Sequence, residues 1–93
     1  MNRFIIRVEL HGAKSEHYSL LHKKLNAFAV TDVMMDDHGY GYKLPPGEYS
    51  YTGTAICKDV LVGVRRIASE VIVPNAVLVT EMNQAQWEGL SFA

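Results

Sequence analysis

The sequence has one cysteine, three prolines and no long uninterrupted run of apolar residues. Cys57 alone cannot form an internal disulfide, and neither a span of about 18 apolar residues nor a signal-like leader precedes the first predicted strand. These absences favour the cytoplasm. Positive charge is also scarce: 9 Lys and Arg against 10 Asp and Glu give a formal net charge of −1, which argues against a strongly basic nucleic-acid-binding protein.

Motifs of the common cofactor and metal sites are missing as well. No spacing matches a zinc site, and Gly39-Tyr40-Gly41 lacks the later glycine and the following helix of a nucleotide-binding loop. No cofactor and no bound metal are predicted. Carboxylates at converging strand ends suit Mg²⁺ or Mn²⁺, so one alternative remains, a site built from Glu9, His11, Asp36 and Asp37.

What the chain does contain is enough for one folded domain. Its 93 residues are 48% hydrophobic and 20% charged, which is ordinary for a globular protein with a single core. Residues 1–82 are predicted to form the domain. Residues 83–93 are predicted to be a tail that forms a short helical turn around Trp87 and Leu90 or packs on a neighbouring subunit.

Two long segments in the first third of the chain have clear periodicity. Residues 3–11 alternate as in a half-buried strand, with the even-numbered set from Phe4 to Leu10 facing the core. Ser15 is the predicted N-cap of a helix. The apolar residues of that helix, spaced to share one face, are Tyr18, Leu21, Leu25 and Phe28.

The middle of the chain is rich in tyrosine and in turn-forming residues. Residues 30–35 are predicted to be a strand that ends in the turn Asp36-Asp37-His38-Gly39, and residues 39–47 a proline-stiffened loop. Residues 48–55 alternate again, with Tyr49 and Tyr51 assigned to the core. The opposite assignment would make these tyrosines a base-stacking platform.

The last third predicts one helix and one strand. Residues 58–71 form an amphipathic helix despite the cost of Gly63 within it, and residues 76–81 form the final strand. The order strand, helix, strand, strand, helix, strand predicts a ferredoxin-like α+β fold: a four-stranded antiparallel sheet with both helices on one face. In that fold the first two strands end at the same edge of the sheet, which would bring His11 beside the turn at residues 36–39.

This predicted convergence points to acid–base chemistry on RNA. Cleavage through the 2′-hydroxyl requires proton transfer and a nearby cation. The candidate catalytic residues are His11, Asp36, Asp37 and His38. The candidate RNA-binding residues are Arg3, Arg7, Tyr40, Tyr42, Lys43, Arg65 and Arg66. The alternative interpretation is that His11 is a solvent-exposed strand end, that residues 36–38 are only a turn, and that the arginines are solvated.

The pattern resembles the GhoS family of antitoxins from type V toxin–antitoxin systems, which have a ferredoxin-like fold similar to that of the Cas2 proteins. The resemblance covers most of the chain, from Asn2-Arg3-Phe4-Ile5-Ile6-Arg7-Val8 through the acidic turn to Val77-Leu78-Val79-Thr80. It implies an endoribonuclease that cleaves the messenger RNA of a membrane-damaging toxin. RNA is then the expected partner, together with a second copy of the chain, and neither DNA nor a membrane is expected.

A second hypothesis comes from a different functional class. The near-neutral charge, Ile5 on the open sheet face and the apolar tail with Trp87, Leu90 and Phe92 also suit a small protein–protein interaction module without catalytic activity. Such a module could be an inhibitor encoded by a mobile element or a dimerisation domain.

Overall fold

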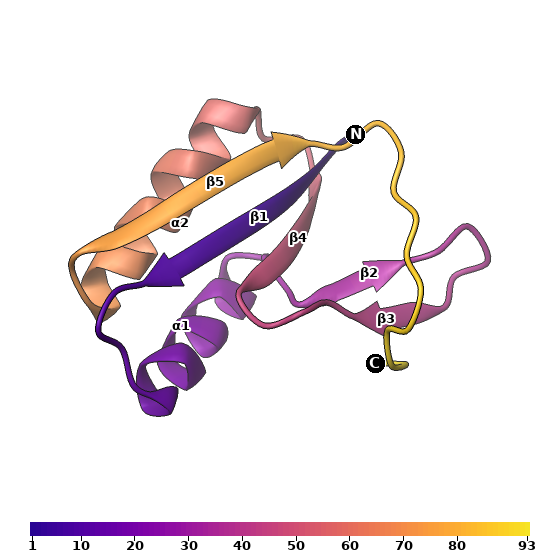
Figure 1. Ribbon diagram of the computed structural model, residues 1–93. Helices are drawn as coiled ribbons and strands as arrows, with labels where there is room; N and C mark the ends of the chain where they lie inside the picture. Colours follow the sequence, from indigo (N-terminus) through magenta and orange to yellow (C-terminus); the bar gives the residue numbers. More distant parts are fainter.

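A three-stranded antiparallel sheet forms the centre of the protein. The computed structural model describes residues 1–93, and Figure 1 shows the sheet with two helices behind it. Strand β1 (Asn2–Leu10) lies between β4 (Glu48–Gly53) and β5 (Asn75–Glu81). Ile6 stands at the middle of the register, opposite Tyr49 on one side and Val79 on the other. The alternation predicted for the first strand is therefore confirmed.

Both helices pack on one face of this sheet. Helix α1 (Ser15–Ala27) and helix α2 (Cys57–Val71) cover the side to which the even-numbered residues of β1 point. The buried cluster consists of Phe4, Ile6, Val8, Leu10, Leu21, Leu25, Val30, Tyr49, Val60, Val64, Ile67 and Ala68. Tyr51 packs against this cluster from β4, so the assignment of both strand tyrosines to the core is also confirmed.

The two helices meet where Gly63 of α2 receives the ring of Phe28. A Cβ atom at Gly63 would collide with the end of that ring. Beside this contact, Lys24 Nζ of α1 lies 3.4 Å from Glu70 Oε1 of α2. From the sequence, Gly63 is expected only to lower the stability of the helix. The structure shows that its missing side chain permits the close approach of α1 and α2.

The ends of α1 depend on local hydrogen bonds. Lys14, and not Ser15, is the N-cap residue, and its backbone N–H donates to Nδ1 of His17 at 2.9 Å. At the other end, the Val30 N–H donates to Leu25 O and the Ala29 N–H to Asn26 O. These two bonds form a Schellman motif, in which Ala29 takes the left-handed conformation with φ of 62°.

The predicted four-stranded sheet is wrong. Strand β2 (Val33–Met35) pairs with β3 (Gly41–Lys43), a strand absent from the prediction, and the two form a separate antiparallel hairpin. The predicted loop at residues 39–47 therefore contains a strand. Across the tight turn at residues 36–39, β3 reaches β2 with little loss of chain entropy, whereas pairing β2 fully with β4 would require a longer loop to close.

Only a short connection joins the hairpin to the main sheet. Thr31 and Ser50 exchange backbone hydrogen bonds of 3.1 and 2.7 Å, and Ser50 Oγ donates to Val33 O at 2.6 Å. Beyond this bridge β2 leaves the sheet, and the hairpin extends to the side of the molecule opposite the end of β1 (Figure 1).

The tail (residues 83–93) is extended and contains no helix. It returns to the hairpin, where the Lys43 N–H donates to Ser91 O at 2.8 Å and the Ala93 N–H donates to Gly41 O at 3.0 Å. Of the two predicted forms, a tail or a short helix, the structure has the tail, whose last residues bond to β3. Neither α1 nor α2 is long and apolar enough to span a bilayer.

Candidate functional site

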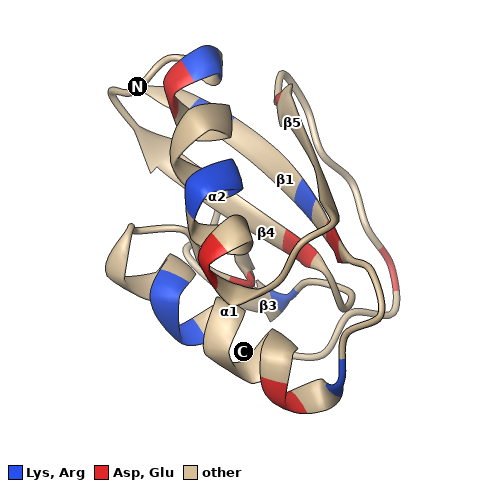
Figure 2. Ribbon diagram, turned by 90° about the vertical axis from the view of Figure 1, so that its left-hand side faces the viewer, with Lys and Arg blue, Asp and Glu red and all other residues tan.

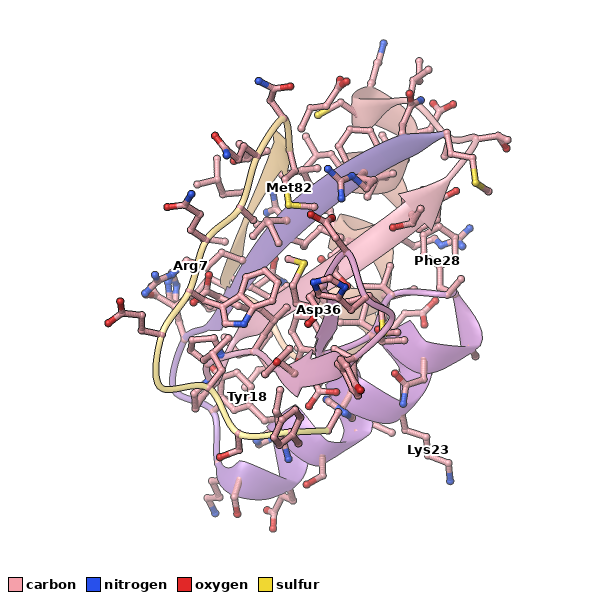
Figure 3. The ribbon with its side chains drawn as sticks, turned by 90° about the vertical axis from the view of Figure 1, so that its right-hand side faces the viewer. Arg7, Tyr18, Lys23, Phe28, Asp36 and Met82 are labelled. Atoms are coloured by element: carbon pink, nitrogen blue, oxygen red, sulfur yellow. The ribbon has the colours of Figure 1, made fainter.

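A groove of about 920 Å³ lies where α1, the β3–β4 connection and the tail meet. Its walls come from β1, from the first half of α1, from residues 43–49 and from residues 89–91. The charged and hydrogen-bonding side chains of the groove that matter most are Arg7, Tyr18, His22, Asp32, Lys43 and Glu48. Figure 3 shows Arg7 beside the returning tail.

His22 and Asp32 form a pair on the wall of this groove. His22 Nε2 lies 3.5 Å from Asp32 Oδ1, and both side chains retain contact with solvent. The ring of His22 also lies against Tyr49, with 5.7 Å between ring centroids. A carboxylate at this distance can orient an imidazole through one nitrogen and leave the other free to exchange a proton.

Tyr18 and Tyr49 hold the inner wall in place. The Leu10 N–H donates to the Tyr18 hydroxyl at 3.0 Å, so that α1 is tied to the end of β1. Burial raises the pKa of the Tyr49 hydroxyl, and the negative charge of Asp32 and the nearby Tyr18 raise it further. Tyr49 therefore stays protonated and contributes no negative charge to the groove.

Four aromatic side chains from the hairpin and the tail gather next to the groove. This aromatic platform consists of Tyr40, Tyr42, Trp87 and Phe92. Phe92 stacks on Tyr42 with 5.0 Å between centroids, Trp87 lies tilted against Tyr42 at 5.4 Å, and Tyr40 meets the Phe92 ring edge-on at 6.4 Å. Tyr40 is 61% exposed and Phe92 is 71% exposed, so rings remain open to a ligand.

The candidate RNA-binding residues divide into two groups in space. Arg7 and Lys43 line the groove beside the platform, and Arg3 stands on the same open face of the sheet as Arg7. Arg65 and Arg66 belong to α2, on the helical side of the sheet. Figure 2 shows basic segments interleaved with acidic ones, so charge attraction alone does not define an RNA-binding surface.

The predicted catalytic residues do not come together. His11 follows β1 and its Nε2 lies 2.7 Å from Glu9 Oε1, whereas Asp36, Asp37 and His38 occupy the turn of the β2–β3 hairpin. These two places are on opposite sides of the molecule in Figure 1. Their convergence was expected because residues 30–35 were predicted to be the fourth strand of the main sheet. Strand β2 instead turns away from that sheet.

Asp36 has a local role in that turn. Its Oδ1 accepts hydrogen bonds of 2.9 Å from the backbone N–H groups of His38 and Tyr40. Partial desolvation raises the Asp36 pKa, but these bonds, the charge of His38 and the Tyr42 hydroxyl outweigh it and hold the pKa below its ordinary value of 3.8. The ionised Asp36 carboxylate thus stabilises the acidic turn.

The alternative metal site does not form either. Glu9 and His11 pair with each other, and Asp36 is occupied by backbone donors. No three His, Cys, Asp or Glu side chains in the protein are arranged to hold a metal ion. Glu9, His11, Asp36 and Asp37 are therefore two separate pairs and not one ligand set.

Sequence reasoning missed both members of the groove pair. His22 lies next to Leu21 on the predicted helix and Asp32 lies within an apolar run, and neither was named as a candidate site residue. The one available signal was that Tyr18 and His22 are one helical turn apart, so both stand on the same side of α1. Their approach to Asp32 follows only from the position of the chain after α1.

The sequence matches no protein-family model and no curated protein.

Proposed function

We propose that the protein is an RNA-directed regulator that binds single-stranded RNA on the aromatic platform and cleaves it in the adjacent groove. The observation that carries this proposal is the cluster of exposed rings around Tyr42. Unstacked bases bind to such rings with about 1–3 kcal/mol per base, and this term does not require a basic protein. A net charge of −1 is therefore compatible with RNA binding.

The groove supplies the cations that a bound strand needs. Lys43 directly follows Tyr42 in β3, and Arg7 approaches from the sheet, so a strand whose bases stack on the platform can direct phosphates toward both side chains. Glu48 is paired across the strands with Arg7 and limits how many phosphates this surface can neutralise. We therefore expect the affinity for RNA to depend more on stacking against the rings than on the salt concentration.

His22 is the proposed general base, and Asp32 is its orienting partner. With Nε2–H directed at Asp32, Nδ1 accepts the proton of a 2′-hydroxyl, whose oxygen then attacks the adjacent phosphorus. The bond from phosphorus to the 5′-oxygen breaks, and that oxygen takes a proton from water. The products are a 2′,3′-cyclic phosphate and a 5′-hydroxyl, and the lysine and arginine stabilise the charge at phosphorus.

The resemblance to GhoS antitoxins extends this proposal to a biological target. The cleaved RNA would be the messenger of a membrane-damaging toxin, and regulation would act through RNA without contact with the toxin. A cytoplasmic location follows from such a substrate and agrees with the lone thiol of Cys57, which has no disulfide partner.

The binding part is tested with the double variant Tyr40→Ala/Phe92→Ala and a fluorescent single-stranded RNA. We expect about a tenfold or greater rise in Kd, because two stacking surfaces are lost. Leu20→Ala removes an exposed apolar side chain from α1 and serves as the control that retains full affinity. Failure of the unmodified protein to retard any RNA from a mixed pool contradicts the proposal.

The cleavage part is tested separately with His22→Gln and Asp32→Asn in the presence of EDTA. His22→Gln is expected to lower the cleavage rate by about a hundredfold or more, while RNA affinity stays unchanged. The matched control is His11→Gln, which removes a histidine that lies outside the groove and should keep full activity. Cyclic phosphate ends are identified by mass spectrometry, and cleavage that persists in His22→Gln excludes this role for the histidine.

A further inference from the structure

Strand β5 presents a free edge on the side away from β1. The bonds from the Met82 N–H to Arg3 O and from the His11 N–H to Pro74 O show that even-numbered residues of β5 and its flanks point their backbone groups at β1. In an antiparallel ladder the intervening residues point theirs outward. The outward groups belong to Asn75, Val77, Val79 and Glu81, and the Cys57 thiol donates a weak hydrogen bond to one of them, with Sγ 3.8 Å from Val79 O.

This edge carries none of the features that normally prevent strand association. Residues 76–80 include no charge, no proline and no bulge in the pairing with β1. Leu78 is 63% exposed on the open face of the sheet, and Val77 and Val79 are only partly buried on the helical face. A flat, uncharged, apolar edge is typical of a strand that pairs with another strand.

The helix above this edge extends the apolar surface. Phe28 at Gly63 and Lys24 at Glu70 fix the side of α2 that faces α1. Cys57 contacts β5 from the other side, and Leu61 lies one helical turn further along that side, 38% exposed. An exposed apolar side chain therefore lies on the side of α2 from which Cys57 contacts this edge.

We infer that β5 pairs antiparallel with β5 of a second copy of this chain, with the two-fold axis at Leu78. In this register Val77 of each copy stands opposite the partner's Val79, and both contribute the outward backbone groups that a hydrogen-bonded pair requires. Leu78 meets the partner's Leu78 on the open face. Ala76 stands opposite the partner's Thr80, and Asn75 opposite the partner's Glu81, so polar ends enclose an apolar centre.

The register is self-complementary, which is the condition for a closed two-fold interface. Pairing joins the two three-stranded sheets into one continuous six-stranded sheet. It also places Leu61 of each α2 beside the axis, where the two helices cover the new strand pair. The β2–β3 hairpins remain at the two far ends, but Leu78 at the axis is the cross-strand neighbour of Arg7, so the test of this pairing is read from association and not from RNA binding.

The test uses the fact that residue 78 of one copy stands opposite residue 78 of the other copy. Sedimentation velocity of the unmodified protein is expected to show a concentration-dependent monomer–dimer equilibrium. Leu78→Lys and Leu78→Glu should each weaken the dimer by about tenfold or more, since like charges stand directly opposite each other. An equimolar mixture of the two variants should recover the dimer as a heterodimer.

Thr52→Lys is the matched control, because it places the same charge on the open face of the opposite edge strand, β4, and should leave the dimer intact. Circular dichroism melting curves establish that the variants fold, as expected for an exposed position. A protein that stays monomeric at all concentrations overturns the inference. A dimer that Leu78→Lys does not weaken also overturns the inference. The same holds if the mixture of Leu78→Lys and Leu78→Glu proteins fails to restore the dimer.

Discussion

The main sheet and the β2–β3 hairpin are stabilised in different ways. In the sheet, Phe4 and Ile6 are completely buried beneath two helices, whereas in the hairpin only Met34 is buried and Met35 is 54% exposed. The hairpin depends instead on the hydrogen bonds of Asp36, the single bridge at Ser50 and the rings that join it to the tail. The difference indicates that the hairpin and tail can open while the sheet and helices remain folded.

The largest expected effect lies in the shared core. Leu25→Ala should lower the free energy of unfolding by about 3 kcal/mol, because a fully buried side chain is replaced by a cavity. Chemical denaturation measures the change. Leu20→Ala on the exposed side of the same helix is the control, with an expected change of about 0.5 kcal/mol or less. Equal effects at the two positions would contradict the described core.

The next largest effect is an increase in stability. Ala29→Gly should raise the free energy of unfolding by about 1 kcal/mol, because glycine adopts the left-handed conformation at this helix end without the steric cost that Ala29 incurs. Ala27→Gly, in the last helical residue of α1, should instead lower stability. A melting temperature that falls in Ala29→Gly would exclude the Schellman geometry described for this end.

A change in the aromatic platform should separate the two regions. Phe92→Ala should change global stability by only about 0.5 kcal/mol, as for other exposed positions, but should speed hydrogen exchange at the Lys43 and Ala93 amides, which bond to the tail and to β3. Phe92→Tyr keeps the ring and should preserve slow exchange. If Phe92→Ala instead accelerates exchange throughout β1, the hairpin and sheet unfold as one unit.

The smallest effect concerns pH. Because the Asp36 pKa is lower in the folded protein than in the unfolded chain, its contribution is fully present above the ordinary value of 3.8 and is lost as the pH falls through the lower, folded value. The Tyr40 amide signal should report this local opening by nuclear magnetic resonance. Asp36→Asn keeps the acceptor without the charge and should remove the pH dependence, whereas Asp36→Ala should loosen the turn at every pH.

The same contrast explains how much the sequence predicts. The alternation of Phe4, Ile6 and Val8 and the helical spacing of Leu21 and Leu25 identify their elements, because each pattern runs through a long segment with one buried face. Strand β3 has only three residues, Gly41–Lys43, too few to show a period. Strand β2 could pair with β3 or with β4. Which of the two it pairs with cannot be predicted from the local sequence pattern.

The candidate site was harder to predict for a related reason. Lys43, Tyr40 and Tyr42 were predicted from their place in the loop after the acidic turn, and they lie at the groove and platform although Gly41–Lys43 forms a strand. His22 and Asp32 meet only through the tertiary path of the chain after α1. The expected meeting of His11 with His38 failed since it depended on the fourth strand that the fold does not have.

The return of the tail also affects how the protein can be handled in experiments. Ala93 bonds to Gly41 and lies beside Phe92, so an affinity tag or a fluorescent fusion added after Ala93 would emerge directly next to the platform. Met1 is 91% exposed, and Figure 1 places the N-terminus apart from the C-terminus. A label at the N-terminus would leave the rings uncovered, and comparing the two labelled forms would reveal how much ligand access depends on them.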